Sequence, residues 1–446
     1  MQINIKRILS YIGVFVATLV GLWLLLIGAA TISNNRIKEN LEKSAYSYRL
    51  VEAFSFSDGE KWNGVADNYA DAIWLNIAWF MGKDEPVYAT LDTKYYDGEE
   101  LGENTGLYLA VTDESIGANT EYTRYWHGTA GIIRMLHLFT DVNGIKALGL
   151  CVALLLATGV AGLLIKDRKV VLAVGFLLSL CAVEIWKIGL SLEYQPAFIL
   201  CFLMCILYLL AEKKGNPLLV GLSVAGGVMT AFFDFLTTET MVILVPLIFV
   251  VIVRSLDGRL DDFKKSFAWV ASCGMAWALS YGATFLAKWS LSTIATGENQ
   301  FLAALSSVEE RTAGSVEDVI QGGVIGQSFY AIASNVSVLF GAEARVDWPL
   351  TIIGMLLFVG AVFSILYLFP KKEKDNTATG LLMILGSVVF LRYFVLGNQS
   401  YLHSFFTYRG LVSTILAAVG ILVVNCQLPI KQKASGKNKR NGKKRG

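Results

Sequence analysis

The sequence predicts an all-α integral membrane protein with about ten transmembrane helices and a large first extracytoplasmic loop that carries two juxtamembrane helices. The 446-residue chain is 54% hydrophobic and has a mean hydropathy of +0.54, which is more apolar than a soluble globular domain. Its apolar residues come in runs of roughly 18–23, about the length that a helix needs to cross ~30 Å of hydrocarbon. Lys and Arg gather in short segments between alternate runs.

The apolar runs define the predicted spans. Lys6 and Arg7 precede the first run, which is longer than the apolar core of a typical signal peptide and is followed by no small-residue cleavage site. We therefore expect a retained first span. The predicted spans are 8–30, 144–165, 170–190, 195–211, 217–236, 238–253, 267–289, 348–369, 378–396 and 405–426.

The basic segments set the predicted orientation, because Lys and Arg near span ends resist translocation. With ten spans, all of these segments fall on one side of the membrane. We therefore expect a multi-pass protein of the plasma membrane with both termini in the cytoplasm. The basic segments contain Lys6 and Arg7; Lys166, Arg168 and Lys169; Lys213 and Lys214; Arg254, Arg259, Lys264 and Lys265; and Lys371, Lys372 and Lys374.

The chain reads as a single polytopic domain, residues 1–426, with a basic and disordered cytoplasmic tail at 427–446. The tail is either a plain topology signal or a binder of anionic lipid headgroups. Two long segments, 31–143 and 290–347, fall on the opposite, extracytoplasmic side. Long loops on one face of an otherwise short-looped bundle usually carry function.

Several classes of protein are excluded by what the sequence lacks. There is no Walker A loop, no GxSxG, no HExxH and no Asp-x-Asp motif. No cytoplasmic segment is long enough to fold a nucleotide-sugar transferase domain, and none has the basic and aromatic character that binds nucleic acid. The six cysteines lie in or beside apolar runs, without disulfide or metal-ligand spacing.

Asp67 and Asp71 are the candidate catalytic acids of the first outer loop. The apolar pattern after Asp71 predicts a helix at the membrane surface, with Trp74 and Trp79 as interfacial anchors. Because the two acids are four residues apart, they share one face at the start of that helix. They act either as an N-cap and a dipole-matched acid or as a general base, with or without a divalent cation.

The end of the first outer loop predicts a second surface helix, with His127 and Arg134 seven residues apart on one face. Gly128, Ala130 and Gly131 allow another backbone or a ligand to approach it closely. A His and an Arg on one interfacial helix suit a phosphate group, although a lone His is more often structural.

Further ionisable residues lie at the outer ends of the predicted spans. Charged groups at membrane depth are costly and face either a partner or a wet cavity. Internal pairing of Glu184 with Lys187, and of Asp234 with Arg392 or Arg409, is one reading. The other is an outer-leaflet cavity with acids on one wall and Arg and His on another, which suits a lipid-linked phosphate. The cavity set is Glu184, Lys187, Glu193, Asp234, Glu239, Arg392, Tyr401, His403 and Arg409.

The segment 290–347 carries Glu298, Glu309, Glu310 and Arg311, and then becomes Gly-rich and amphipathic. It is either a mobile lid that binds an acceptor or a passive surface loop.

Four motifs resemble recurring signatures of polytopic proteins associated with bacterial surface-polysaccharide synthesis, and the resemblance covers most of the chain. The overall layout also resembles the GT-C fold glycosyltransferases. These have a first span, an outer loop in which an acid opens a juxtamembrane helix, a second juxtamembrane helix and a multi-span bundle. The motifs are Asp67-Asn-Tyr-Ala-Asp71, Arg124-Tyr-Trp-His127-Gly, Phe232-Phe-Asp234-Phe-Leu-Thr-Thr and Asn398-Gln-Ser-Tyr401-Leu-His403.

The GT-C resemblance implies transfer of a sugar from a polyprenyl-phosphate donor to a cell-surface glycan or lipid-linked acceptor at the outer leaflet. Asp67 or Asp71 is then the base. Many GT-C enzymes have adjacent acids here, so the four-residue spacing leaves open which one acts. A Pro-rich stretch often opens the second juxtamembrane helix of these enzymes. Trp126-His127-Gly128 stands there instead, so a role for His127 does not follow from the fold.

Under this hypothesis, the donor phosphate is bound by Arg392, His403 and Arg409, with Arg134 and His127 as further candidates. A flippase of lipid-linked glycans would instead require charges near the midplane, broken helices and paired repeats. A polysaccharide polymerase or ligase, or a non-catalytic scaffold, would share much of the outer-face layout.

Overall fold

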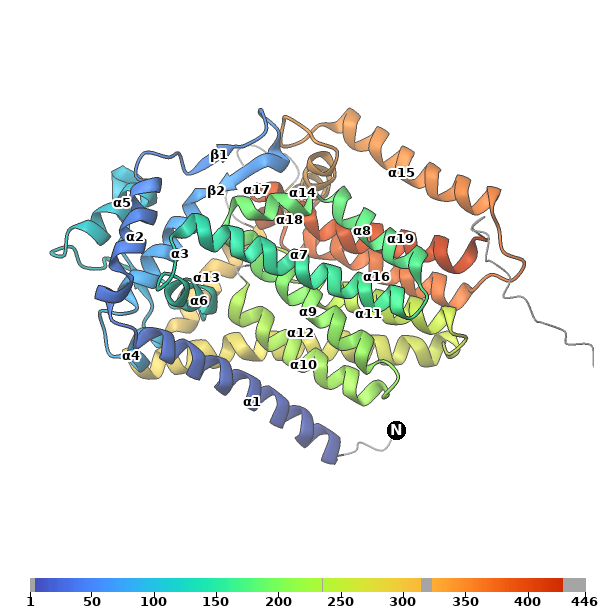
Figure 1. The fold of residues 1–446 in the computed structure, drawn as a ribbon, viewed down its shortest axis with the longest axis horizontal. Helices are drawn as coiled ribbons and strands as arrows, with labels where there is room; N and C mark the ends of the chain where they lie inside the picture. Colours follow the sequence, from blue (N-terminus) through green and yellow to red (C-terminus); the bar gives the residue numbers. More distant parts are fainter. Residues whose placement is uncertain (1–4, 235, 314–322, 428–446) are drawn as a thin grey trace, which may run out of the picture.

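The computed structural model describes residues 5–234, 236–313 and 323–427, which form helices and two small antiparallel sheets (Figure 1). The α-helices are α1 (Ile5–Ala30), α2 (Asn34–Tyr48), α3 (Asn68–Phe80), α4 (Pro86–Leu91), α5 (Gly102–Thr112), α6 (Gly128–Leu136), α7 (Val142–Lys166), α8 (Val170–Ala182), α9 (Gln195–Ala211), α10 (Asn216–Phe233), α11 (Met241–Leu256), α12 (Phe263–Thr296), α13 (Gln300–Ala313), α14 (Gly323–Leu339), α15 (Trp348–Leu368), α16 (Asn376–Val395), α17 (Gly397–Leu402), α18 (Ser404–Thr407) and α19 (Val412–Asn425). Strands β1 (Phe54–Phe56) and β2 (Val65–Asp67) pair, as do β3 (Lys94–Tyr95) and β4 (Thr120–Glu121). The 3₁₀ turns are η1 (Trp62–Gly64), η2 (Glu99–Leu101), η3 (Ile185–Leu190), η4 (Leu192–Tyr194) and η5 (Tyr408–Leu411).

The predicted spans coincide largely with helices, although the third is only partly α-helical. Among the described residues, eight helices are long and apolar enough to cross a membrane. They are α1, α7, α10, α12, α15, α16 and the continuous stretches Leu192–Ala211 and Ser404–Asn425. The other two predicted spans are shorter, since α8 has 13 residues and α11 has 16. The chain is therefore an all-α multi-pass membrane protein by the length and composition of its helices.

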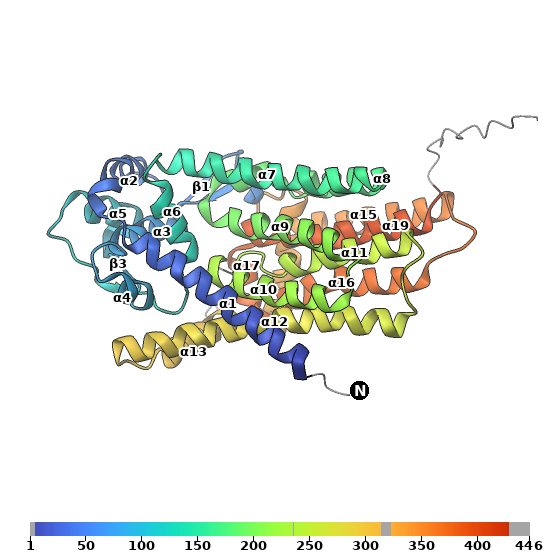
Figure 2. The same cartoon turned by 60° about the horizontal axis from the view of Figure 1, so that its bottom comes forward.

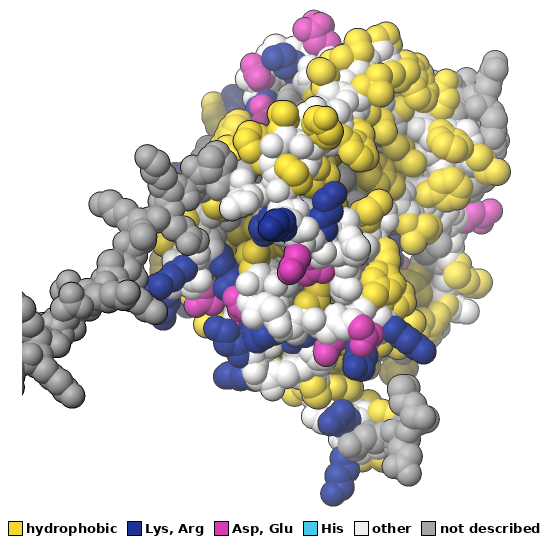
Figure 3. All heavy atoms as spheres, turned by 90° about the vertical axis from the view of Figure 1, so that its right-hand side faces the viewer, with side chains coloured by type: hydrophobic (Ala, Val, Ile, Leu, Met, Phe, Trp, Pro, Cys, Tyr) yellow, Lys and Arg dark blue, Asp and Glu magenta, His cyan; other side chains and the backbone are white. Residues whose placement is uncertain are grey.

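The long helices run side by side, and α2–α6 gather at one end of the bundle (Figures 1 and 2). The connections that carry the basic segments lie at the opposite end, viewed in Figure 3, where Lys and Arg side chains cluster among acids. Ion pairs there join neighbouring connections, with 2.9 Å between Lys169 and Asp257 and 2.8 Å between Arg259 and Glu212. Helix α11 forms the centre, because it is buried throughout from Met241 to Arg254.

Helix α3 is a core helix rather than the predicted surface helix. Every residue of α3 except Tyr69 is buried. Trp74 and Trp79 are 2% and 3% exposed and pack against α2, α5 and α6, so they are not interfacial anchors. The apolar pattern was consistent with either environment, because the helices around α3 supply the same apolar contact that lipid headgroups and acyl chains would.

Helix α6 corresponds to the second predicted juxtamembrane helix, and its glycines permit close packing. A Cβ atom at Gly128 would lie 2.3 Å from the ring of Phe232, and one at Gly131 would lie 2.5 Å from Leu26. The residues that approach α6 at these positions are therefore side chains of α10 and α1.

The third predicted span, 170–190, is only partly α-helical. Helix α8 ends at Ala182, and Glu184 takes a left-handed conformation with φ of 51°. The chain then continues in the 3₁₀ turns η3 and η4. A left-handed residue breaks the α-helical hydrogen-bond ladder, and here it turns Glu193 back toward α3.

The segment 290–347 is largely helical. Helix α12 continues past the predicted span to Thr296, so its 34 residues are about 51 Å long. Helices α13 and α14 follow, and α14 packs on α15, α16 and α17. The described part of the predicted tail ends at Gln427, and the rest lies outside the described residues.

Arg134 joins the first loop to the bundle. Its guanidinium donates to the carbonyls of Ala29 (3.1 Å) and Ala78 (2.5 Å), to the carbonyl of Ile32, and to Asn34 Oδ1 (2.8 Å). These acceptors come from the end of α1, the α1–α2 junction and α3. The side chain is completely buried, so it has a structural role in place of the predicted phosphate contact.

We predict that Arg134→Met lowers the thermal stability of the purified chain in detergent. Each buried carbonyl left without a donor costs about 1–3 kcal/mol. Arg36→Met is the matched control, since Arg36 is an exposed arginine of α2 and should be neutral. The measurement is the unfolding midpoint of each variant, and equal midpoints for the two would contradict this role.

Candidate functional site

Asp67 is held at the start of α3 by both its backbone and its side chain. Its N–H donates to Ser191 Oγ at 2.7 Å, and its carboxylate caps α3 by accepting the Ala70 N–H at 2.9 Å. The predicted capping role is thus present. The carboxyl also forms a hydrogen bond with the carboxyl of Glu193. Asp67 is 2% exposed and Glu193 is 3% exposed.

Burial raises the pKa of Asp67 to about 7, and the neighbouring charge of Asp71 adds to this, against the capping bond from Ala70. Two neighbouring buried carboxyls cannot both be charged without a large electrostatic cost. A carboxyl such as that of Asp67, with a pKa near neutrality, is suited to general acid–base chemistry.

Asp71 is fully occupied as a structural acid. It accepts hydrogen bonds from Tyr48 Oη and from the Leu192 N–H, each at 2.8 Å, and pairs with Lys146 Nζ at 2.7 Å. Tyr48 belongs to α2, Lys146 to α7 and Leu192 to η4. Asp71 therefore fixes the turn that carries Glu193 against the start of α3.

Asp234 and Glu239 continue the row of acids. Asp234 accepts the Thr237 N–H at 3.1 Å and the Thr237 hydroxyl at 2.5 Å, which shapes the turn between α10 and α11. Arg392 pairs with Glu239, with Nε–Oε1 and Nη2–Oε2 distances of 2.9 and 3.3 Å. The pairing of Asp234 with Arg392 or Arg409, one of the two readings of the sequence, is not seen among the described residues, where Arg392 pairs with Glu239 and acts on Asp234 only through its nearby charge. Glu193 lies within electrostatic range of both Asp67 and Asp234.

His403 lies in a cluster of cations from separate segments. Burial lowers its pKa to about 3, and the charges of Arg311, Arg345 and Arg392 contribute. The guanidinium of Arg345 stacks at 4.6 Å from the Trp62 ring and 5.2 Å from the Tyr401 ring. Among the described residues, His403 Nδ1 is buried without a hydrogen-bond partner. His403 and Arg392 thus lie together, as predicted, and neutral His403 can donate to an anion.

A cavity of about 300 Å³ lies between α12, α13 and the turn that follows α10. One wall is a ladder of aromatic rings spaced four residues apart on α12, namely Trp277, Tyr281, Phe285 and Trp289. Successive ring centroids in this ladder are 5.0, 5.1 and 6.0 Å apart.

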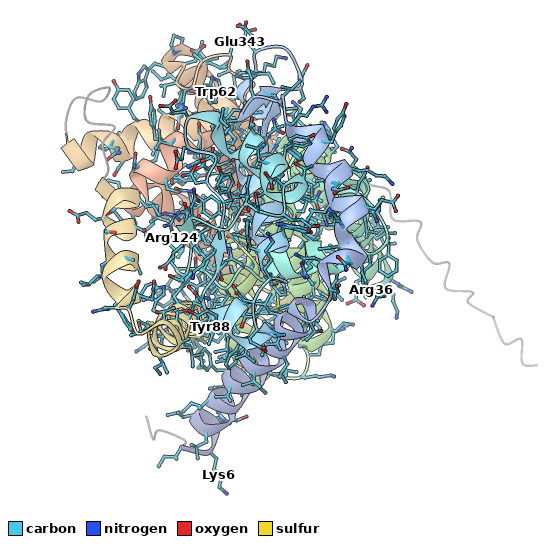
Figure 4. The ribbon with its side chains drawn as sticks, turned by 90° about the vertical axis from the view of Figure 1, so that its left-hand side faces the viewer. Lys6, Arg36, Trp62, Tyr88, Arg124 and Glu343 are labelled. Atoms are coloured by element: carbon cyan, nitrogen blue, oxygen red, sulfur yellow. The ribbon has the colours of Figure 1, made fainter. Side chains whose placement is uncertain are left out.

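Charged residues also line this cavity. Arg124 and Arg311 line it together with Glu239, and Figure 4 shows Arg124 inside the end face, beside α13. Arg124 lies 4.2 Å from the centroid of Tyr122, and Arg311 lies 5.3 Å from that of Tyr125. In the described part of the chain, Arg124 Nε and Arg311 Nη1 are buried without hydrogen-bond partners. The cavity therefore offers a cationic head and an aromatic body to an amphipathic anion.

Sequence reasoning did not assign Arg124, Arg311 or Arg345 to the site. Arg124 belongs to the Arg124-Tyr-Trp-His127-Gly motif, and Arg311 lies in the segment 290–347. The available signal was the four-residue aromatic spacing in 277–289, which marks one helix face. A stripe of this kind is indistinguishable in sequence from ordinary helix packing.

Two other predicted phosphate ligands are engaged elsewhere. Arg409 donates to the carbonyls of Phe405 and Asn63 and stacks on Tyr194 and Tyr408. His127 contacts the Tyr122 carbonyl at 2.7 Å, and burial lowers its pKa to about 3, with a further contribution from Lys288. Neither His127 nor Arg409 lines the aromatic cavity.

The remaining predicted cavity residues form two local arrangements. Glu184 pairs with Lys187 at 3.0 Å, as predicted, and Lys187 also contacts Asp58 and Asn63. Tyr401 lies under Arg345, beside His403. The acids do not converge on one point, since no three His, Cys, Asp or Glu side chains among the described residues are placed to hold a metal ion.

Comparison with known proteins gives no match. No family model, no curated protein and no solved structure matches the chain. Its residues and their geometry therefore carry the functional inference.

We predict that Asp67 makes stability fall as pH rises. The folded chain binds this proton with a pKa of about 7, whereas an unfolded Asp has a pKa of about 3.9. Between these values the folded state holds more protons, so the free energy of unfolding decreases with pH. Asp67→Asn should reduce the fall in unfolding midpoint between pH 5 and 7.5, and exposed Asp84→Asn should not. Identical pH profiles for wild type and Asp67→Asn would contradict the assignment.

Proposed function

We propose that this protein is a GT-C-like membrane glycosyltransferase. It moves a sugar from a polyprenyl-phosphate donor to a cell-surface glycan or lipid-linked acceptor. The observation that carries the proposal is the aromatic cavity with Arg124 and Arg311 at its head, next to a row of buried carboxyls. A polyprenyl phosphate matches this cavity, because its anionic phosphate suits the arginines and its long apolar chain suits the aromatic wall.

The donor chain lies along the α12 ladder, and its phosphate meets the two arginines. Guanidinium groups bind phosphate oxygens with charge-assisted hydrogen bonds. Arg345 and His403 extend the cationic surface. In this pose, the donor sugar faces Glu239 and the acids behind it.

The Asp67–Glu193 pair supplies the general base. Its unprotonated carboxylate takes the proton of the acceptor hydroxyl as that oxygen bonds to the sugar's anomeric carbon. The bond from the anomeric carbon to the phosphate oxygen breaks, and the polyprenyl phosphate leaves with the electron pair. Arg124 and Arg311 stabilise the charge that develops on the leaving group. No step requires a divalent cation, although one bound with the donor phosphate is compatible with the chemistry.

The site belongs on the extracytoplasmic side of the plasma membrane. The basic connections all lie at the other end of the bundle (Figure 3), and such segments remain in the cytoplasm. Both termini are then cytoplasmic.

We predict the corresponding labelling pattern in a variant whose native cysteines are replaced. A cysteine introduced at Asp113, exposed at the end of α5, should react in intact cells with a membrane-impermeant maleimide. A cysteine at Lys264, exposed in the first turn of α12, should react only after lysis. The reverse pattern would place the site on the cytoplasmic side.

We predict that Asp67→Asn abolishes product formation in a deletion strain, whereas wild type and Asp84→Asn restore it. Loss of a general base costs about 10²–10⁴-fold in rate. Arg124→Gln and Arg311→Gln should also lose product, and Arg36→Gln should not. The measurement is glycan composition at matched membrane levels of each variant.

Restoration of wild-type glycan by both Asp67→Asn and Glu193→Gln would remove the base from the proposal. A flippase would show a different pattern, because it forms no glycosidic bond. Its loss would leave the membrane enriched in a complete lipid-linked glycan.

A further inference from the structure

A second groove lies on the other side of the acids. It has a volume of about 320 Å³ and is formed by α6, α7 and α9. Phe233, the residue before Asp234, lines this groove, whereas Leu236, two residues after it, lines the aromatic cavity. The turn at Asp234 therefore lies between two apolar spaces.

The wall of this groove is uncharged. Its polar side chains include Thr129, which donates to the Phe233 carbonyl, and Gln195, which donates to the Lys146 carbonyl. Among the described residues that line it, none is Lys, Arg, Asp or Glu. The groove thus lacks the cations that a phosphate needs, in contrast to the cavity at Arg124.

Acidic residues directly follow two of the lining residues in the chain. Leu192 and Phe233, both in the lining, precede Glu193 and Asp234 in the chain. The nearby Lys146 is already paired with Asp71. An anionic headgroup would be repelled here, while a neutral group rich in hydroxyls can donate hydrogen bonds to carboxylates.

The groove is continuous with the lipid-facing side of α7. Leu148 lines it and is 44% exposed, and Leu155, about two turns further along the same face, is 71% exposed. Since α7 has the length and composition of a membrane span, these leucines face hydrocarbon. An alkyl chain can pass from the bilayer into the groove without leaving an apolar environment.

We propose that this groove binds the hydrocarbon chain of a lipid-anchored acceptor with an uncharged sugar headgroup. The proposal rests on the proposed transferase function and deepens it, because it makes the acceptor a lipid-linked glycan instead of a soluble saccharide. Donor and acceptor then reach the acids from opposite sides of the Asp234 turn. Each lipid keeps its chain in the membrane while their headgroups meet at the carboxyls.

The test uses the full chain in phosphatidylcholine nanodiscs, with two photoactivatable probes that share a twelve-carbon diazirine chain. One probe carries a neutral disaccharide and the other carries phosphocholine. Labelled peptides are mapped by mass spectrometry. We expect the glycoside probe to label the α7 and α9 peptides around Val152 and Ile199 at least fivefold more than the phosphocholine probe. Unlabelled alkyl glycoside should compete, and the free disaccharide should not.

Val152→Trp and Ile199→Trp fill the groove and should each reduce glycoside labelling about fivefold or more. Leu155→Trp is the matched control, because it adds the same side chain to α7 outside the groove lining. Equal labelling by both probes, or labelling that the Trp variants leave unchanged, would overturn the proposal. The wild-type competition needs no variant, so a variant that misfolds does not remove the test.

Labelling requires no turnover, so its outcome is separate from that of the proposed function. Loss of product in Asp67→Asn with no glycoside labelling would retain the transferase and reject this acceptor groove. Glycoside labelling together with normal product in both Asp67→Asn and Glu193→Gln would retain the groove and reject the proposed base.

Discussion

The site depends on the buried carboxylate of Asp71. A charge removed from water is costly, and it is retained only where donors and an opposite charge replace the lost hydration. Here Tyr48, Lys146 and the Leu192 N–H supply them from three separate elements. Because all of these partners are needed, the position of η4 relative to α3 is fixed. That position brings Glu193 to Asp67, so the structural acid sets the geometry of the candidate catalytic pair four residues earlier.

The arginines of this chain divide by what holds them. Arg134 and Arg409 donate to backbone carbonyls of distant segments, which makes each a link between them. Arg392 is neutralised by Glu239. Arg124 and Arg311 lie over aromatic rings, as Arg409 does, and unlike Arg409 they line the aromatic cavity. Binding function follows from the partners of the guanidinium, and a sequence motif does not reveal those partners.

The dependence on distant partners also explains which features of the structure could be predicted from the sequence. Hydropathy located the spans, and loop charge grouped the basic connections at one end, because both are properties of single segments. Short pairs such as Glu184 with Lys187 were also accessible, since three residues along the chain place them together. The pairing of Arg392 with Glu239 spans about 150 residues and depends on how α16 packs near the α10–α11 turn. Likewise, the burial of Trp74 and Trp79 depends on what α2, α5 and α6 place around α3.

Stacking on aromatic rings also explains how acids and cations coexist in one site without cancelling each other. A guanidinium over a tyrosine or tryptophan face gains electrostatic stabilisation while its positive charge remains uncompensated. Arg124 and Arg311, over Tyr122 and Tyr125, stay available to an anion for this reason. On the acid side, the proximity of Asp67 and Glu193 disfavours a negative charge on both carboxyls at once, which lowers the cost of burial. The cations and the acids therefore occupy separate walls, an arrangement that would stabilise the charge separation of the proposed sugar–phosphate cleavage.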